Sequence, residues 1–137
     1  MNEKKYKHIT IWADDSHPDM IFGIYSPKLE IDIHIAKELV DNRLDYTGGR
    51  PAYTLIDFTN VKSVTKEARD YMNSPEGGLR GLLGGAFLSN NVVATLFVNL
   101  YLKVNIPTIP AKMFTNKVEA INWLKKIKLE KGPLVEA

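Results

Sequence analysis

Three side chains that could bind a metal ion lie at helical spacing in the first half of the chain. His34 and Glu38 are four residues apart, and Asp41 follows three residues later. Residues three and four apart share one face of a helix, so these groups would point in the same direction. A metal site needs further ligands at fixed geometry, and no additional ligand motif accompanies them. We therefore expect a solvated helix face, without a metal ion or another cofactor.

The sequence offers little for nucleophilic or acid–base catalysis. It contains no cysteine and no Gly-x-Ser-x-Gly turn, and neither His8 nor His17 stands in a ligand pattern. Asp14 and Asp15 are adjacent, and neighbouring residues of a strand point to opposite faces, so they would make a poor acid–base pair. We expect no catalytic residues and no enzymatic activity.

Five glycines between Gly77 and Gly85 invite comparison with a phosphate-binding loop. That loop places its glycines after a strand and ends in Gly-Lys-Ser or Gly-Lys-Thr before a helix. Here the glycines come before and inside an apolar strand, and no such lysine follows. A β-bulge or the close approach of another backbone better explains Gly84 and Gly85.

A better candidate for anion binding is the segment Ser89, Asn90 and Asn91, which precedes an apolar helical pattern. Free N–H groups at the start of a helix attract negative charge. Serine and asparagine side chains also cap helices, and capping is the commoner role. Both interpretations stay open at this point.

These residues are set in alternating strand and helix patterns. Strands are expected at residues 6–13, 20–25, 53–58, 82–88 and 112–114, and helices at 33–44, 65–73, 92–104 and from Asn116 onward. The order ββαβαβαβα predicts an α/β domain with a mixed, mostly parallel sheet, an N-terminal hairpin and about four helices. We expect one domain over residues 1–137, with fraying at residues 1–5 and 132–137.

This order resembles the STAS fold, the fold of bacterial anti-sigma-factor antagonists, and the chain resembles uncharacterised bacterial STAS-like proteins. The likeness is carried by residues 55–61 (LIDFTNV), residues 65–69 (TKEAR), the apolar helical pattern from Val92, and the ending over residues 112–124. The resemblance implies a non-catalytic protein-interaction or regulatory module.

One part of the antagonist pattern is missing. In those proteins a strand leads into an Asp-Ser-(Ser or Thr)-Gly motif that opens a helix, and a serine of the motif is phosphorylated. The matching segment here is Thr65-Lys66-Glu67-Ala68, so lysine and glutamate replace the serines. The hydroxyls of Ser63 and Thr65 remain as candidates for phosphorylation, although helix capping explains Thr65 more simply.

The predicted helix at residues 92–104 is apolar on more than one side. Val98 and Leu102, with Tyr101 on the flank, lie opposite the stripe that would face the sheet. A protein partner or second copy of the chain, a neighbouring helix, or a small apolar ligand could cover this surplus. The first explanation predicts a partner interface at these three residues. The third makes binding of a small apolar or anionic ligand the alternative function.

Composition narrows the choice of partners. The chain has 137 residues, of which 18 are basic and 16 acidic, and its formal net charge of +2 is too balanced for a nucleic-acid-binding surface. It contains no run of about 18 apolar residues and no apolar signal core near its start, so we expect no membrane span. These features favour a cytoplasmic protein.

Overall fold

The computed structural model describes residues 2–89 and 109–131. In chain order its elements are β1 (Lys4–Lys5), β2 (Ile9–Ala13), β3 (Met20–Tyr25), β4 (Leu29–Ile31), α1 (Ile33–Thr47), β5 (Ala52–Asp57), β6 (Val61–Val64), α2 (Lys66–Met72), β7 (Leu82–Leu88), β8 (Ala111–Phe114) and α4 (Lys117–Lys131). The apolar helix expected at residues 92–104 and the tail at residues 132–137 lie outside the described residues.

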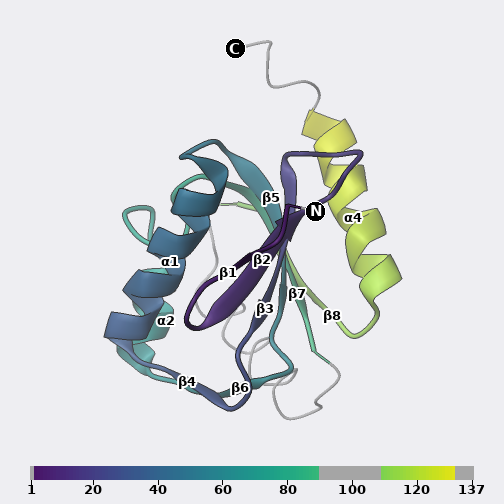
Figure 1. Ribbon diagram of the computed structural model, residues 1–137. Coiled ribbons are helices and arrows are strands. Elements are labelled where there is room, and N and C mark those ends of the chain that lie inside the picture. Colours follow the sequence, from purple (N-terminus) through teal and green to yellow (C-terminus); the bar gives the residue numbers. More distant parts are fainter. Residues whose placement is uncertain (1, 90–108, 132–137) are drawn as a thin grey trace.

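Six strands form the central sheet in the order β1-β2-β3-β5-β7-β8. The first three pair antiparallel, and β3, β5, β7 and β8 pair parallel. This arrangement confirms the predicted α/β fold, with a mostly parallel sheet and an N-terminal hairpin. Helices α1 and α2 cover one face of the sheet, and α4 covers the other (Figure 1). We call these the α1/α2 face and the α4 face.

Three short strands are not predicted by the sequence pattern. We expected residues 1–5 to fray, but Lys4 and Lys5 pair with β2, and Lys4 Nζ lies 2.9 Å from Oδ2 of Asp45. Strands β4 and β6 form a separate two-stranded parallel sheet, and each leads into the start of a helix. With two to four residues each, these strands are too short for an alternating pattern to be recognised.

Each of the three described helices begins at a capping residue, as the sequence predicts for Thr65. In each case the cap side chain accepts a hydrogen bond from the backbone N–H three residues on: Asp32 from Ile35 at 2.9 Å, Thr65 from Ala68 at 3.1 Å, and Asn116 from Glu119 at 3.0 Å. Each bond satisfies a donor that the helix itself leaves free. The caps therefore fix where the helices start above the sheet.

The sheet divides the core into two apolar clusters. The buried members on the α1/α2 face are Ile9, Ile11, Ile21, Tyr25, Leu29, Ile31, Ala36, Leu39, Ala52 and Ala68. Those on the α4 face are Met20, Phe22, Tyr53, Leu55, Ala86, Ala120, Leu124 and Ile127. The last helix contributes Ala120, Leu124 and Ile127 to this second cluster.

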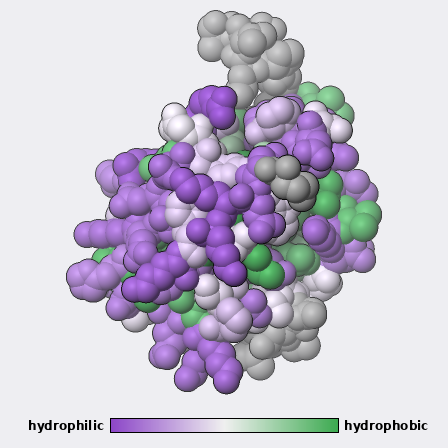
Figure 2. All heavy atoms as spheres, in the orientation of Figure 1, coloured by the Kyte–Doolittle hydropathy of each residue, from purple (hydrophilic) through white to green (hydrophobic). Residues whose placement is uncertain are grey.

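The surface is mainly hydrophilic in the view of Figure 2, where hydrophobic side chains form small, separated groups. The most exposed large apolar side chains of the described residues are Val118 and Leu129 on α4, at 65% and 80%. Within residues 2–89 and 109–131, no helix combines the length and apolar content needed to cross a bilayer.

Candidate functional site

Two of the three side chains that were considered as metal ligands contact other charged or polar groups. Glu38 Oε1 lies 3.7 Å from Nε2 of His8, Asp41 Oδ1 lies 3.8 Å from Nη2 of Arg80, and His34 is exposed. In the described part of the chain, no three His, Cys, Asp or Glu side chains are placed to hold a metal ion. Glu38 and Asp41 instead form long-range polar contacts across the surface.

The described candidate residues for phosphorylation and for anion binding lie in different parts of the fold. Ser63 is exposed on β6, and Thr65 caps α2 as predicted. Ser89 is fully buried after β7, and its N–H donates to the carbonyl of Phe114 at 3.0 Å. Phosphorylation at Ser63 or Thr65 stays a prediction.

The remaining predicted site residues lie outside the described residues. They are Asn90 and Asn91 of the anion site, and Val98, Tyr101 and Leu102 of the partner interface. The anion site and the interface therefore stay predictions that rest on the sequence.

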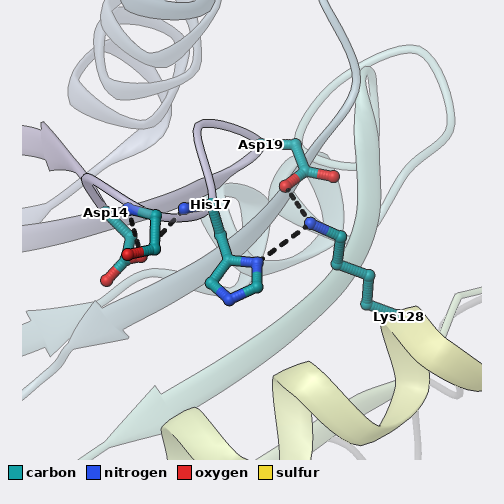
Figure 3. A network of polar contacts seen from close by, with 5 residues as sticks. Asp14, His17, Asp19 and Lys128 are labelled. Carbon is teal, nitrogen blue, oxygen red and sulfur yellow. Dashed lines mark hydrogen bonds and ion pairs between the residues drawn. The ribbon is translucent and has the colours of Figure 1, made fainter.

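A polar network joins α4 to the turn between β2 and β3 (Figure 3). Lys128 Nζ lies 2.7 Å from Oδ1 of Asp19 and 3.3 Å from Nδ1 of His17. Asp14 Oδ2 accepts hydrogen bonds from the N–H groups of Ser16 and His17, which shapes the turn. Because Lys128 and Asp19 neutralise each other's charge, we assign this network a structural role: it holds α4 against the hairpin of β2 and β3.

A cavity of about 140 Å³ lies between the sheet and helices α1 and α2. Its floor includes one row of residues across three neighbouring strands: Thr54 of β5 pairs with Gly85 of β7, which pairs with Ala111 of β8. Directly paired residues of a sheet point to the same face. Three small residues therefore lie side by side, and they leave space beneath the helices.

A β-bulge sets the register of this row. Ala52 pairs with Leu82, but the next residue, Tyr53, pairs with Gly84, so β7 carries Leu83 as an extra residue. A bulge of one residue reverses which face the following side chains point to. The bulge expected from the glycines of this strand is confirmed, and it decides which glycine faces each side of the sheet.

The two adjacent glycines of β7 have opposite surroundings. On the α4 face, a Cβ atom on Gly84 would lie 2.6 Å from Cδ1 of Ile127, so the helix packs closely onto the strand. On the α1/α2 face, a Cβ atom on Gly85 would meet nothing closer than the ring of Phe87 at 3.6 Å. Gly84 therefore permits tight packing, whereas Gly85 contributes open space.

Aromatic and aliphatic side chains line the rest of the cavity. The ring of Phe58 makes edge-on contacts with Tyr25 and Phe87, with ring centroids 5.5 and 5.8 Å apart. Leu39 and Val40 reach the cavity from α1. Such a lining favours an apolar molecule of limited size.

Arg43 of α1 brings a charge into this apolar lining. Arg43 is 7% exposed and lies on the buried side of the helix. Nη2 donates a hydrogen bond to the carbonyl of Gly78 at 2.9 Å, whereas Nη1 is buried and has no hydrogen-bond partner. No ion pair among the described residues includes Arg43. Burial lowers the pKa of Arg43 to about 10, so the guanidinium still carries its charge at neutral pH.

Thr54 adds a second unpaired polar group to the same cavity. The residue is 3% exposed, and its Oγ1 is buried without a hydrogen-bond partner. The described lining also contains Arg69 of α2 and no acidic side chain. Burying unpaired polar groups costs free energy, and the cost is larger for a charge, so such groups call for an explanation.

Neither Arg43 nor Thr54 is among the site residues predicted from the sequence. Arg43 lies three residues after Val40 and seven after Ala36, so a charge on the buried stripe of the helix was a usable signal. Thr54 interrupts an apolar run in the same way. The proximity of Thr54 to Gly85 and Ala111 had no such signal, because it depends on the register of three distant strands.

Comparison with known proteins identifies a family and a similar fold. A family model described as a domain of unknown function (DUF7793) matches residues 12–128. A solved structure from Shewanella loihica PV-4, an uncharacterised protein of the DUF3478 family with a SpoIIAA-like fold, is similar with a TM-score of 0.59 and 16% sequence identity. The match covers 88% of this chain and 98% of that chain, and it agrees with the predicted STAS-like fold. No curated protein matches.

Proposed function

This chain belongs to the DUF7793 family, and we propose that it is a non-catalytic binding module. Its ligand is a small, mainly apolar molecule held between the sheet and helices α1 and α2. The observation that carries the proposal is the row of Thr54, Gly85 and Ala111, which leaves a cavity of about 140 Å³.

The size of the cavity sets the size of the ligand. An apolar cavity of about 150 Å³ is known to admit one benzene molecule, and sites for drug-sized molecules are at least about twice as large. A ligand of roughly six to nine non-hydrogen atoms therefore fits. An empty volume of this size in a core costs on the order of 3 kcal/mol of stability, which a bound molecule would offset in part.

The chemistry of the lining supports binding without catalysis. The unpaired groups are a guanidinium and a hydroxyl, and the described lining contains no carboxylate or imidazole that could act as a base toward Thr54. A threonine nucleophile needs such a base within hydrogen-bond reach. The cavity is therefore suited to holding a molecule rather than transforming it.

Titration with toluene, followed by backbone amide NMR, tests this function. We expect concentration-dependent shifts at Thr54, Gly85 and Ala111 in the wild type. Gly85→Val would place two methyl groups in the cavity and should abolish the shifts, and Ala111→Leu serves as a second filling variant. Val118→Leu, which adds a methylene group on exposed α4, is the matched control and should bind like the wild type. Absence of shifts, or shifts confined to the α4 face, would refute the proposal.

A regulatory role through a protein partner is the second candidate function. It is favoured by the exposure of Val118 and Leu129, which are eleven residues apart and so lie on the same side of α4. The resemblance to the STAS fold points in the same direction. Sedimentation of the wild type, Leu129→Asp and Leu102→Asp would test self-association, with a folded monomer expected for a variant at the interface. A wild type that stays monomeric at high concentration would exclude self-association.

A further inference from the structure

We infer that the molecule held in this cavity is a small carboxylate, with its apolar body over Gly85 and its charged end at Nη1 of Arg43. The inference rests on the proposed function and deepens it by naming the chemical class of the ligand. It starts from the unpaired nitrogen of Arg43, which is buried in the lining of the cavity.

The charge of Arg43 has no counter-ion in the described structure. Its hydrogen bond is donated to the neutral carbonyl of Gly78. The described lining adds Arg69 and no acidic group. A buried charge without a partner is strongly unfavourable, so an anion that enters the cavity would supply what the protein lacks.

Arg43 also has a structural role, but only one nitrogen of its guanidinium, Nη2, takes part in it. The bond from Nη2 to Gly78 ties α1 to the loop that follows α2. It does not explain why Nη1 is also buried, without a hydrogen-bond partner, in a residue that lines an apolar cavity. A lysine or glutamine could make one such bond, whereas a fork of two donors matches a carboxylate.

Thr54 provides a second unpaired donor in the lining of the cavity. Arg43 projects from α1 and Thr54 from β5, and both line the same space. A carboxylate oxygen can accept from each of these groups. A phosphate has more oxygen atoms and more charge than the two unpaired donors can satisfy in a lining that is otherwise apolar, so the carboxylate is the better match.

Benzoate and benzamide test the inference, because they share shape and size and differ in charge at neutral pH. We expect the wild type to bind benzoate at least about tenfold more tightly than benzamide in NMR titrations, since hydrogen bonds to a buried charge are the stronger ones. Arg43→Met keeps an unbranched, flexible side chain and removes its charge and its hydrogen-bond donors. This variant should lose the preference for benzoate and still bind benzamide. If it does not fold, Arg43→Gln provides the same neutral comparison.

The outcomes separate this inference from the function on which it rests. Equal affinity of the wild type for benzoate and benzamide would overturn it, as would an undiminished preference for benzoate in the methionine or glutamine variant. Binding of toluene without binding of benzoate would overturn the inference and leave the proposed function standing. If toluene, benzamide and benzoate all fail to bind, both are refuted.

Discussion

The two faces of the central sheet are packed differently, although they share the same strands. On the α4 face, the helix lies so close to β7 that a Cβ atom on Gly84 would clash with Ile127. On the α1/α2 face, Gly85 opens onto a cavity of about 140 Å³. Neighbouring residues of one strand thus serve dense packing on one side and open space on the other.

The polar groups differ between the faces as well. Lys128 of α4 is paired with Asp19 at 2.7 Å, whereas Arg43 of α1 has no ion pair and leaves Nη1 unpaired. The buried hydroxyl of Tyr53 is an unpaired group on the α4 side. Each face therefore carries an unpaired buried hydroxyl, whereas the unpaired buried charge lies on the α1/α2 face, beside the cavity.

Leucine-to-alanine substitutions on the two faces should show the largest difference in stability. Leu124 of α4 is fully buried, and Leu39 of α1 is 4% exposed but lines the cavity. We expect Leu124→Ala to lower the free energy of unfolding by about 4 kcal/mol and Leu39→Ala by about 2–3 kcal/mol, because Leu39 already lacks contacts on one side. Urea denaturation measures both. A larger loss for Leu39→Ala would contradict the difference in packing.

Alanine at the two glycines should have opposite effects. Gly84→Ala forces Cδ1 of Ile127, the end of a flexible side chain, to move within a packed interior, and should cost up to about 1 kcal/mol. Gly85→Ala finds room and should raise stability by up to about 1 kcal/mol, since glycine is unfavourable inside a strand. Thermal and urea unfolding give both values, and a similar change at the two positions would show that the faces are packed alike.

Methionine at the two cationic residues should give the smallest effects. Lys128→Met removes a partly exposed ion pair and should cost up to about 1 kcal/mol, less in high salt. Arg43→Met loses the bond to Gly78 but relieves a buried, unpaired charge, so stability should stay within about 1 kcal/mol of the wild type or rise. A loss of more than about 2 kcal/mol for Arg43→Met would assign the residue to structure alone.

The fold could be predicted from the sequence because its main elements carry strong local signals. The bounds of β3 and β7 match the prediction, and Thr65 caps α2 as expected. Short strands carry no such signal, so β1, β4 and β6 were missed. Their pairing depends on neighbours distant in the chain rather than on local pattern.

The candidate site could be predicted only in part. Arg43 is recognisable in the sequence because a charged residue stands on the apolar side of a predicted helix. The glycines of β7 likewise indicated a bulge. The cavity itself arises when the bulge at Leu83 aligns Gly85 with Thr54 and Ala111. That register is a property of the assembled sheet, and no single segment of the sequence contains it.

A crystal structure of the protein under xenon pressure would show whether the two faces differ in open space, because xenon enters apolar cavities without regard to the chemistry of the natural ligand. We expect a bound xenon atom over Gly85, between Thr54 and Ala111, and none on the α4 face between β7 and Ile127. Absence of xenon from the α1/α2 face, or xenon bound under α4 instead, would contradict this expectation.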